Sequence, residues 1–519
     1  MTAPTLMIQG TASSVGKSLL VTGLCRLFQQ AGLRVAPFKS QNMALNSAVT
    51  ADGLEIGRAQ AVQADAAGIA ATADMNPILL KPEGDRRSQV VVLGKPIGSM
   101  SAVEYHAYKP ALSGVIAGSL ARLREAYDLV LIEGAGSPAE INLKANEIVN
   151  MHVAALADAP VVLAGDIDRG GVFAAFVGTL ELLEPHERAR VAAFIVNKFR
   201  GDVALLEPGL RMLTERTAVP VLGVVPYVHH LRIADEDSVS LDDRARRRRP
   251  ARDELDIAVV RLPRIANHDD VEPLEHEPGV AVRFVDHPAD LAGADLVIVP
   301  GSKNTISDLA WLRASGLADA VLARGRAGEP ILGVCGGCQM LGDSIEDPHG
   351  VEGTATRVAG LGLLPLATQF ARDKRTAQVR ARIAGASFLT AFAATGAVLD
   401  EPVLGYEIHM GRAEPSRACP RAFEIATRNG GATAALDGAI GGDGLIVGTM
   451  IHGLFDNDAL RAATLASLRA RRGLPAPPPR AIPTKRAEYD RLAAAVRGGL
   501  DPDLLWRLIG RPAPARSRC

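Results

Sequence analysis

The chain has 519 residues, with 57 lysine and arginine residues against 58 aspartate and glutamate residues, and its formal net charge is −1. This balance provides no overall basic field, which argues against nucleic acid or an anionic membrane surface as a partner. The N-terminus lacks the pattern of a signal peptide, and no uninterrupted apolar run approaches the about 18 residues of a membrane span. Five cysteines, an odd number, do not indicate a disulfide framework. We therefore expect a cytoplasmic protein that needs neither a membrane nor nucleic acid.

Short apolar runs alternate with longer helical patterns in the first half of the chain. Hydrophobic residues make up 48% of the sequence, enough for large cores, and the length alone predicts two to four domains. Continuous runs of Val, Ile and Leu separated by helices are typical of a mostly parallel sheet that helices cover on both faces. We predict a doubly wound α/β domain over residues 1–234. Its expected strands are residues 5–10, 34–40, 128–134, 160–166, 191–199 and 220–226.

A glycine-rich loop follows the first expected strand. The stretch GTASSVGKS places Gly10 and Thr11 at its start, and Gly16, Lys17 and Ser18 at its end, where a helix is expected. Backbone N–H groups of such a loop bind phosphate, the lysine reaches the β- and γ-phosphates, and the serine hydroxyl binds Mg²⁺. The spacing between the glycines is one residue longer than in the standard loop, and an ordinary glycine-rich turn is the alternative. The strand–loop–helix context favours nucleotide binding.

Polar residues at the ends of later strands are candidates for the same site. A phosphate site needs acidic residues to hold its metal ion, and Glu133 ends an apolar strand where ligands bind in parallel sheets. Asp166 ends another strand and is expected nearby. Asn197 ends a third strand together with Lys198, and its amide has the groups to read an adenine edge. A plain surface carboxylate is the alternative interpretation of Glu133.

The strand–helix pattern breaks at residues 235–254, where charges of both signs occur without apolar periodicity. We place a linker between two domains here. The arginine run at residues 246–249 is the alternative candidate for a nucleic-acid patch. Acidic residues on both sides weaken its field, so the linker is preferred.

Strands resume after the linker and again alternate with helices. This pattern predicts a second doubly wound α/β domain over residues 255–460. A proline-rich spacer and an amphipathic helix at residues 487–500 follow, and we expect residues 461–519 to form a helical tail. The expected strands of the second domain are residues 255–263, 280–286, 294–301, 330–337, 377–385, 403–411 and 444–455.

One of these strands runs into the stretch GVCGGCQML, residues 333–341, which contains two cysteines. Cys335 stands where a nucleophile elbow between a strand and a helix carries its serine, and the small residues around it permit a sharp turn. The helix that begins there favours the reactive thiolate. Cys338 falls within the first helical turn and is expected to pack. A zinc site would need two more ligands, and a redox pair is the remaining alternative.

A thiolate nucleophile needs a partner for its proton. His452 follows an apolar strand late in the same domain, so the strand end can present it to Cys335. A core histidine is the alternative interpretation. His409 is a rival for the role, although it lies within a strand pattern. Backbone N–H groups of Gly336 and of the loop at Gly301 and Ser302 are expected to form an oxyanion hole.

These motifs together resemble known enzymes. With GVCGGCQMLG as the nucleophile motif and IHGLF as the histidine motif, the second half resembles a class I glutamine amidotransferase domain. The first half resembles the dethiobiotin synthetase family of P-loop enzymes, whose loop has the same longer spacing. In this order, the whole chain resembles the cobyric acid synthase family of cobalamin biosynthesis. Matching segments include FKSQNMALNS, DGLEIGRAQ, IEGAGSPAEINL, GDIDRGGVFA, LPRIANHDDVEPL and GYEIHMGR.

The resemblance implies ATP and Mg²⁺ as cofactors, glutamine as the nitrogen donor and a corrinoid as the substrate. The reaction would amidate the b, d, e and g side-chain carboxylates of adenosylcobyrinic acid a,c-diamide to give adenosylcobyric acid. Asp52 becomes a second candidate metal ligand. Four cations in or near the matching segments are candidates to meet substrate carboxylates, with a surface charge as the alternative for each: Lys39, Arg58, Lys81 and Lys95.

One position departs from ordinary class I amidotransferases. Their histidine is followed two residues later by a glutamate that orients it, whereas this chain has Leu454 there. The cobyric acid synthase branch is similar in lacking that glutamate. The group that orients His452 is therefore open at this stage, as are the oligomeric state and the route of ammonia between the domains.

Three other functions compete with this interpretation. Cobyrinic acid a,c-diamide synthase shares both domains but amidates other carboxylates. A partitioning-type ATPase switch shares the P-loop, but its loop usually carries an extra lysine near the first glycine, where this chain has Gly10-Thr11. A non-catalytic relative of the amidotransferases would bind a partner, and the intact Cys335 argues against it.

Overall fold

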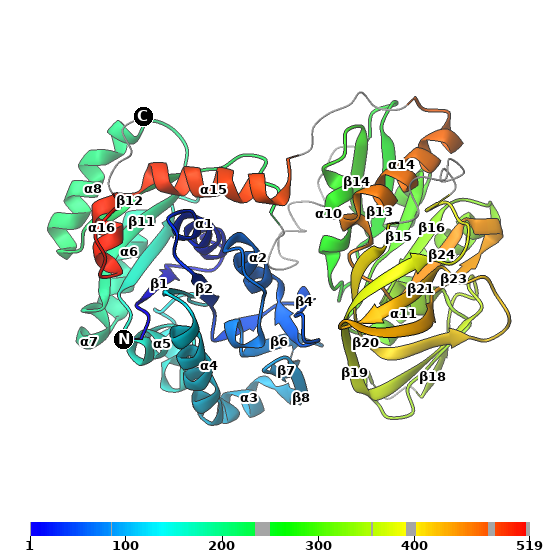
Figure 1. The fold of residues 1–519 in the computed structure, drawn as a ribbon, viewed down its shortest axis with the longest axis horizontal. Coiled ribbons are helices and arrows are strands. Elements are labelled where there is room, and N and C mark those ends of the chain that lie inside the picture. Colours follow the sequence, from blue (N-terminus) through cyan, green and yellow to red (C-terminus); the bar gives the residue numbers. More distant parts are fainter. Residues whose placement is uncertain are drawn as a thin grey trace.

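The structure is a computed structural model that describes residues 2–84, 86–233, 250–353, 356–390, 401–475 and 483–514. Two α/β units lie side by side (Figure 1). The predicted fold class is confirmed, because each unit contains a mostly parallel sheet. Residues 235–249 of the expected linker, with the arginine run, lie outside the described residues. Within the described ranges, no helix has the length and apolar character needed to cross a bilayer.

A parallel sheet of six strands forms the centre of the N-terminal unit. Its apolar runs are buried because core clusters lie on both of its faces. All six expected strands are present, and the order across the sheet is β12-β11-β10-β1-β9-β2. The bounds are β1 (Thr5–Gly10), β2 (Val35–Phe38), β9 (Leu129–Glu133), β10 (Val161–Asp166), β11 (Val191–Phe199) and β12 (Val221–Pro226).

Helices cover this sheet, and the first of them, α1 (Lys17–Gln30), begins directly after the glycine-rich loop. Because β1 lies between β9 and β10, the loop is next to the carboxyl ends of both neighbours. The other helices of the unit are α2 (Arg58–Ala66), α3 (Ala102–Tyr108), α4 (Ser113–Ala126), α5 (Met151–Ala157), α6 (Val172–Leu182), α7 (Pro185–Arg188) and α8 (Val203–Thr217).

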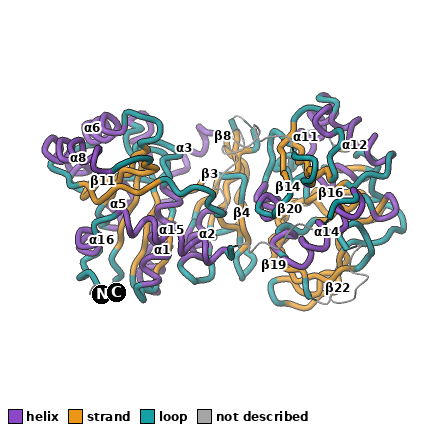
Figure 2. Tube along the Cα trace, turned by 90° about the horizontal axis from the view of Figure 1, so that it is seen from above, coloured by secondary structure: helices purple, strands orange, loops and turns teal. Residues whose placement is uncertain are grey.

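Two small sheets of the N-terminal unit were not predicted. Figure 2 shows β3, β4 and β8 between the two units. These strands are short and carry many polar residues, so they give no clear periodic signal. One sheet has the order β3-β6-β7-β8, and the other pairs β4 with β5. The bounds are β3 (Gln41–Met43), β4 (Ser47–Val49), β5 (Glu55–Gly57), β6 (Ile78–Pro82), β7 (Arg87–Val92) and β8 (Lys95–Ser101).

The C-terminal unit has its own six-stranded sheet, in the order β14-β13-β15-β16-β24-β23. It is parallel apart from β23 (Ala439–Gly441), which pairs antiparallel with β24. The other strands are β13 (Leu255–Val260), β14 (Val280–Val285), β15 (Leu296–Val299), β16 (Ile331–Val334) and β24 (Ile446–Thr449). The helices before the last strand are α10 (Glu272–Glu275), α11 (Thr305–Ala314), α12 (Leu317–Arg326) and α13 (Gly336–Leu341).

Two of the later predicted strands belong to a different sheet from the one expected. β19 (Leu366–Ile383) and β20 (Val403–Pro415) pair antiparallel with each other in a separate sheet. Burial alternates along the second half of β19, as in sheets with one face toward solvent. The remaining strands of this sheet are β17 (Ser344–Glu346), β18 (Arg357–Ala359), β21 (Phe423–Arg428) and β22 (Gly431–Asp437).

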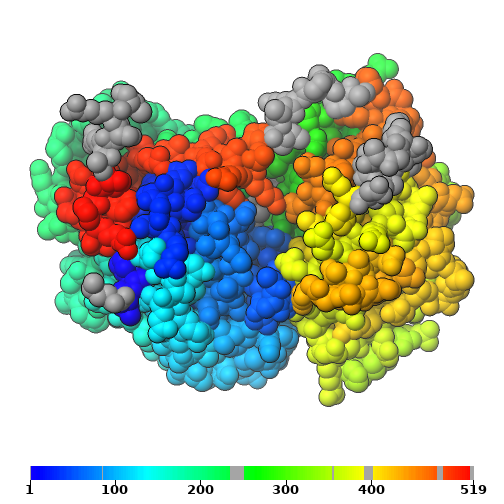
Figure 3. Space-filling model, in the orientation of Figure 1, coloured from blue at the N-terminus to red at the C-terminus, as the bar shows by residue number. Residues whose placement is uncertain are grey.

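The helices of the C-terminal tail divide between the two units. α14 (Asp458–Arg472) packs on the C-terminal unit, where Leu460 and Leu468 join the core. α15 (Lys485–Gly499) and α16 (Pro502–Leu508) lie on the N-terminal unit, and α15 packs along α1. Figure 3 shows the red atoms of these last helices against the blue atoms of the first residues. The tail therefore connects the two units a second time.

Candidate active sites

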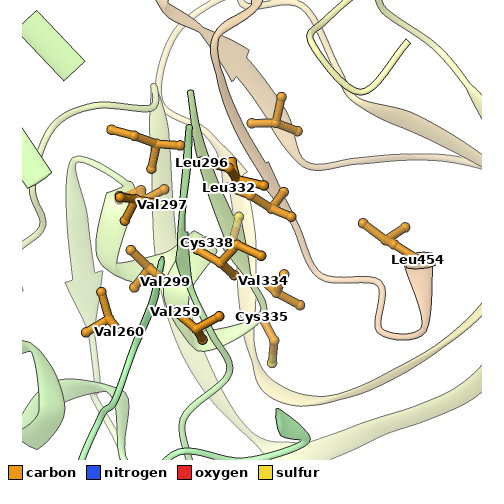
Figure 4. Close-up of a cluster of buried hydrophobic side chains, with 14 of the residues drawn as sticks. Val259, Val260, Leu296, Val297, Val299, Leu332, Val334, Cys335, Cys338 and Leu454 are labelled. Atoms are coloured by element: carbon orange, nitrogen blue, oxygen red, sulfur yellow. The ribbon is translucent and has the colours of Figure 1, made fainter. Parts of the chain in front are cut away.

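Cys335 lies in the tight turn between β16 and α13. Its φ of +51° and ψ of −109° are strained for a residue with a side chain. The neighbouring glycines permit this turn, because a Cβ atom at Gly337 would collide with the carbonyl oxygen of Val299. In Figure 4 the sulfur of Cys335 points away from the apolar cluster beneath it. The turn therefore presents the sulfur at the end of the strand, as the elbow motif predicts.

Cys338 occupies a different environment from Cys335. It is fully buried and lies among apolar side chains of the sheet, as Figure 4 shows. Burial raises the pKa of its thiol well above the ordinary value. Both cysteines are free, and the described residues contain no group of three or more His, Cys, Asp and Glu side chains that could hold a metal ion. This environment suits a packed neutral thiol.

We expect Cys338→Ala to keep most of the glutamine-dependent activity. Loss of the buried sulfur should cost about 1–2 kcal/mol of stability, because it leaves a small cavity in the core. Denaturant titration and a glutamine-dependent amidation assay measure the two effects. A loss of activity as large as that of a Cys335 variant would restore the paired-cysteine interpretation.

His452 follows β24 and lies beside Cys335 in one cavity. Burial lowers the pKa of its imidazole, but the Asp270 carboxylate and then Cys335 more than offset this and raise it to about 10. Nδ1 of His452 lies 2.6 Å from Oδ2 of Asp270, whose other oxygen accepts a 2.8 Å hydrogen bond from the N–H of Gly453. The imidazole is therefore protonated at neutral pH and suited to stabilise a thiolate.

Asp270 is the side-chain partner of Nδ1 of His452, a contact that the sequence did not reveal. It lies in a 3₁₀ turn (His268–Val271) and is 182 positions from His452 along the chain. It replaces the glutamate that ordinary class I amidotransferases carry where this chain has Leu454. No local spacing links the two residues. The only available signal was the segment LPRIANHDDVEPL, which contains Asp270 and contributed to the family resemblance.

We expect Asp270→Asn to lower glutamine-dependent turnover by up to about 10⁴-fold, because an amide cannot stabilise the imidazolium. The pKa of His452 then falls from about 10, so the proton is lost at lower pH. The alkaline limb of the pH–rate profile for glutamine hydrolysis should move to lower pH. Amidation from free ammonia should be unaffected. An unmoved alkaline limb would contradict the role of Asp270.

The loop at Gly301 and Ser302 lies against the elbow. A Cβ atom at Gly336 would be 2.8 Å from the backbone nitrogen of Ser302, and one at Gly301 would be 3.3 Å from Cε1 of His452. The structure thus brings both predicted oxyanion-hole residues to Cys335. His409 lines the same cavity, but its Nδ1 lies 2.6 Å from the Gly411 carbonyl and burial lowers its pKa.

The cavity beside Cys335 has a volume of about 60 Å³ and is closed by both units. Gln339, Glu352 and Lys374 line it from the C-terminal unit, and Lys81 and Gln89 from the small sheet of the N-terminal unit. It fits one small amide-bearing molecule better than a macromolecule.

The glycine-rich loop borders a much larger cavity, of about 910 Å³. The Nζ atom of Lys17 donates to the carbonyl oxygens of Ala12 and Gly136 at 3.1 and 3.0 Å, so it curls over the loop. Gly16 has a φ of +95°, and a Cβ atom there would collide with the amide nitrogen of Asn197. That amide donates to the carbonyl of Val15 at 2.8 Å. The predicted phosphate-loop residues and Asn197 therefore share one site.

Gly10 and Thr11 complete the loop at its first turn. The N–H of Thr11 donates to the carbonyl of Ala164 at 2.9 Å, which fixes the loop to β10. Lys198 joins the same region, because its Nζ atom donates to the Ser14 carbonyl at 2.7 Å and to Asp166 at 2.8 Å. Asp166 is therefore tied to the loop.

Ser18 lines this cavity and contacts Glu133, which is buried behind it. The Ser18 hydroxyl donates to Oε1 of Glu133 at 2.9 Å, and Lys39 lies 2.8 Å from the same oxygen. Hard oxygen donors of this kind fit Mg²⁺, which usually takes one or two protein ligands and completes its shell with phosphate oxygens and water. The structure does not bring Asp52 to this site. It is exposed in the turn between β4 and β5, where Thr50 donates to it at 2.5 Å.

The four candidate substrate cations lie in four different places. Lys39 faces the large cavity beside Glu133, and Lys81 faces the small cavity, where it binds Glu55 at 2.8 Å. Arg58 lies between the two units, with 16% of its side chain exposed. Lys95 is exposed at the start of β8, outside both cavities.

The two cavities define the class of protein, a nucleotide-binding unit joined to a cysteine-dependent amidotransferase unit. Residues 6–241 match the CobQ/CobB/MinD/ParA nucleotide binding domain, and residues 256–460 match the CobB/CobQ-like glutamine amidotransferase domain. The chain belongs to the cobyric acid synthase family, because full-length relatives with that name are highly similar to it.

Three of these relatives show the extent of the similarity. Cobyric acid synthase of Sorangium cellulosum (strain So ce56) is 66% identical over 516 residues, which cover 98% of this chain and 99% of the relative. The protein of that name from Dehalococcoides mccartyi (strain CBDB1) is 50% identical over 98% of this chain and 99% of its own length. The one from Salmonella heidelberg (strain SL476) is 52% identical over 97% and 98%.

Proposed function

We propose that the protein uses ATP and glutamine to amidate the b, d, e and g carboxylates of adenosylcobyrinic acid a,c-diamide, which gives adenosylcobyric acid. The observation that carries the proposal is the presence of two separate sites in one chain. One presents Cys335 with His452 and Asp270, and the other presents Lys17 beside Ser18. The similarity of the whole chain to cobyric acid synthases supports this choice of substrate.

The small cavity performs the glutamine half of the reaction. Cys335 attacks the side-chain amide carbon of glutamine, and His452 donates its proton to the departing ammonia. The backbone N–H of Gly336 and the loop at Gly301 stabilise the oxyanion. Water then hydrolyses the glutamyl thioester, which releases glutamate and restores Cys335.

The large cavity activates the carboxylate, which is a poor acyl donor at neutral pH. Lys17 neutralises charge on the γ-phosphoryl group as it passes from ATP to the carboxylate oxygen. Ser18 and Glu133 would hold Mg²⁺, which supplies further charge neutralisation at the phosphates when bound. Ammonia then attacks the acyl carbon and phosphate leaves. Asn197 lies where it can contact the nucleotide.

The mouth of the large cavity suits a corrinoid. Met43 and Leu143 line it with 54% and 47% of their surface exposed, so they offer apolar surface to a bound ligand. Lys109 and Lys144 stand beside them, and partial burial lowers the pKa of Lys109. A macrocycle with carboxylate side chains matches this combination of apolar surface and cations.

Mass spectrometry of the corrinoid product tests the proposed function. With ATP, Mg²⁺ and glutamine, adenosylcobyrinic acid a,c-diamide should gain amides in four successive steps. Amidation of cobyrinic acid at only two positions would indicate the a,c-diamide synthase instead. ATP hydrolysis without any amide would favour a partitioning-type switch. We place this reaction in the cytoplasm, without a nucleic-acid partner.

A further inference from the structure

Arg58 of the N-terminal unit contacts residues of the C-terminal unit that lie around His452. It is the first residue of α2, and one of its terminal nitrogens lies 2.8 Å from Oδ2 of Asp269. The same nitrogen donates to the hydroxyl of Tyr406 at 2.6 Å and to the carbonyl of Ser47 at 3.0 Å. Asn267 reinforces the contact, because its amide also donates to the Tyr406 hydroxyl, at 2.7 Å.

The two partners of Arg58 in the C-terminal unit, Asp269 and Tyr406, lie around His452. Asp269 is the chain neighbour of Asp270, which binds Nδ1 of His452. The ring of Tyr406 stacks on the imidazole with centroids 5.2 Å apart and an interplanar angle of 15°. The backbones of Tyr406 and His452 also exchange two hydrogen bonds, at 3.2 and 2.9 Å. His452 is thus held on one side by Tyr406, which Arg58 contacts, and on the other by Asp270, the chain neighbour of the second partner of Arg58.

We propose that Arg58 is a positioning residue for glutamine hydrolysis, supplied by the unit that binds ATP. It fixes Asp269 and Tyr406 and thereby the orientation of Asp270 and His452. Glutamine hydrolysis consequently reaches full rate only when the two units are docked around Arg58. This inference rests on the glutaminase half of the proposed function.

Arg58 also balances charge at this buried place. Burial raises the pKa of Asp269 and Arg58 opposes this, while the nearby carboxylates of Asp270 and Asp456 raise it further. Lys485 pairs with Asp456 at 2.9 Å, and Tyr489 also faces the cluster from α15. Without the guanidinium, the carboxylate of Asp269 accepts a proton at higher pH. Protonation of Asp269 removes a negative charge that faces the imidazolium of His452.

The test compares Arg58→Gln and Arg58→Lys with the wild-type protein. Arg58→Gln should lower the turnover number of glutamine hydrolysis roughly 10- to 100-fold with little change in KM, because a misplaced catalytic group costs rates of this size. Its acid limb in the pH–rate profile should move to higher pH. Arg58→Lys retains the charge, so it should return the acid limb toward the wild-type position. Amidation from free ammonia should persist in both variants.

Thr376→Val provides a matched control. Thr376 donates to the carbonyl of Gly53 across the same interface but does not reach His452. This variant should retain the wild-type rate and pH profile. An unchanged rate and acid limb in Arg58→Gln would overturn the proposal, and so would equal losses with glutamine and ammonia, which would assign Arg58 to the ATP-dependent step. A wild-type protein that hydrolyses glutamine without amidating the corrinoid would contradict only the proposed function.

Discussion

Cys335→Ala should lose amidation from glutamine and retain amidation from free ammonia. Removal of a covalent nucleophile costs about 10⁶-fold in turnover in enzymes where it has been measured, so the defect should be unmistakable. The ATP cavity does not contain Cys335, and alanine fits the turn no worse than cysteine does at the same φ of +51°. Amide formation is measured by mass with each nitrogen source, at mildly alkaline pH where more NH₃ is present.

Cys338→Ala is the matched control for this variant, since it removes a sulfur three residues away in the helix that follows the turn. Two outcomes would contradict the two-site model. Near-normal glutamine use in Cys335→Ala would remove Cys335 from the reaction. Loss of ammonia use by a folded Cys335→Ala protein would place Cys335 in the synthetase chemistry.

Lys17→Ala should lose amidation from both nitrogen sources, because activation of the carboxylate precedes the attack of ammonia. A cation on the transferred phosphoryl group is worth about 10³- to 10⁵-fold in phosphoryl transfer. Glutamine hydrolysis, measured as glutamate release, should continue in this variant. Lys17→Ala should therefore disable the ATP site and spare the glutamine site, whereas Cys335→Ala should do the reverse.

Arg211→Ala controls for the loss of a positive charge, since Arg211 is an exposed cation on α8 outside both cavities. It should match the wild-type protein with either nitrogen source. If Lys17→Ala amidated the corrinoid from ammonia at the normal rate, Lys17 would have no part in activation.

Local sequence patterns were sufficient to predict the parts of each site that are formed by one turn between a strand and a helix. The loop from Gly10 to Ser18 and the elbow at Cys335 each combine a strand, a few small residues and a helix start, so their geometry follows from adjacent residues. His452 was found because it follows a strand of the same parallel sheet, and carboxyl ends of parallel strands lie along one edge.

The rest of the site depends on contacts between residues far apart in the chain. Asp270 and Tyr406 reach His452 from a turn and from β20, which the sequence had assigned to the parallel sheet. Arg58 reaches them from the other unit. Spacing carries no information about such contacts, because packing of two folded units brings the groups together. Asp52 is the opposite case. The family resemblance made it a candidate metal ligand, but its segment folds into a turn away from Glu133.

The position of the last helices affects how the protein folds during its synthesis on the ribosome. Leu492, Val496 and Trp506 belong to the same core as β1 and α1, and the ring of Trp506 meets that of Phe28 at a centroid distance of 5.3 Å. The ribosome conceals the most recently added residues, so this face of α1 stays uncovered until α15 and α16 have left the ribosome. The N-terminal unit is thus completed only after the C-terminal unit has been made, and a chain released at residue 460 would leave the apolar side chains of α1 in this core exposed to chaperones and proteases.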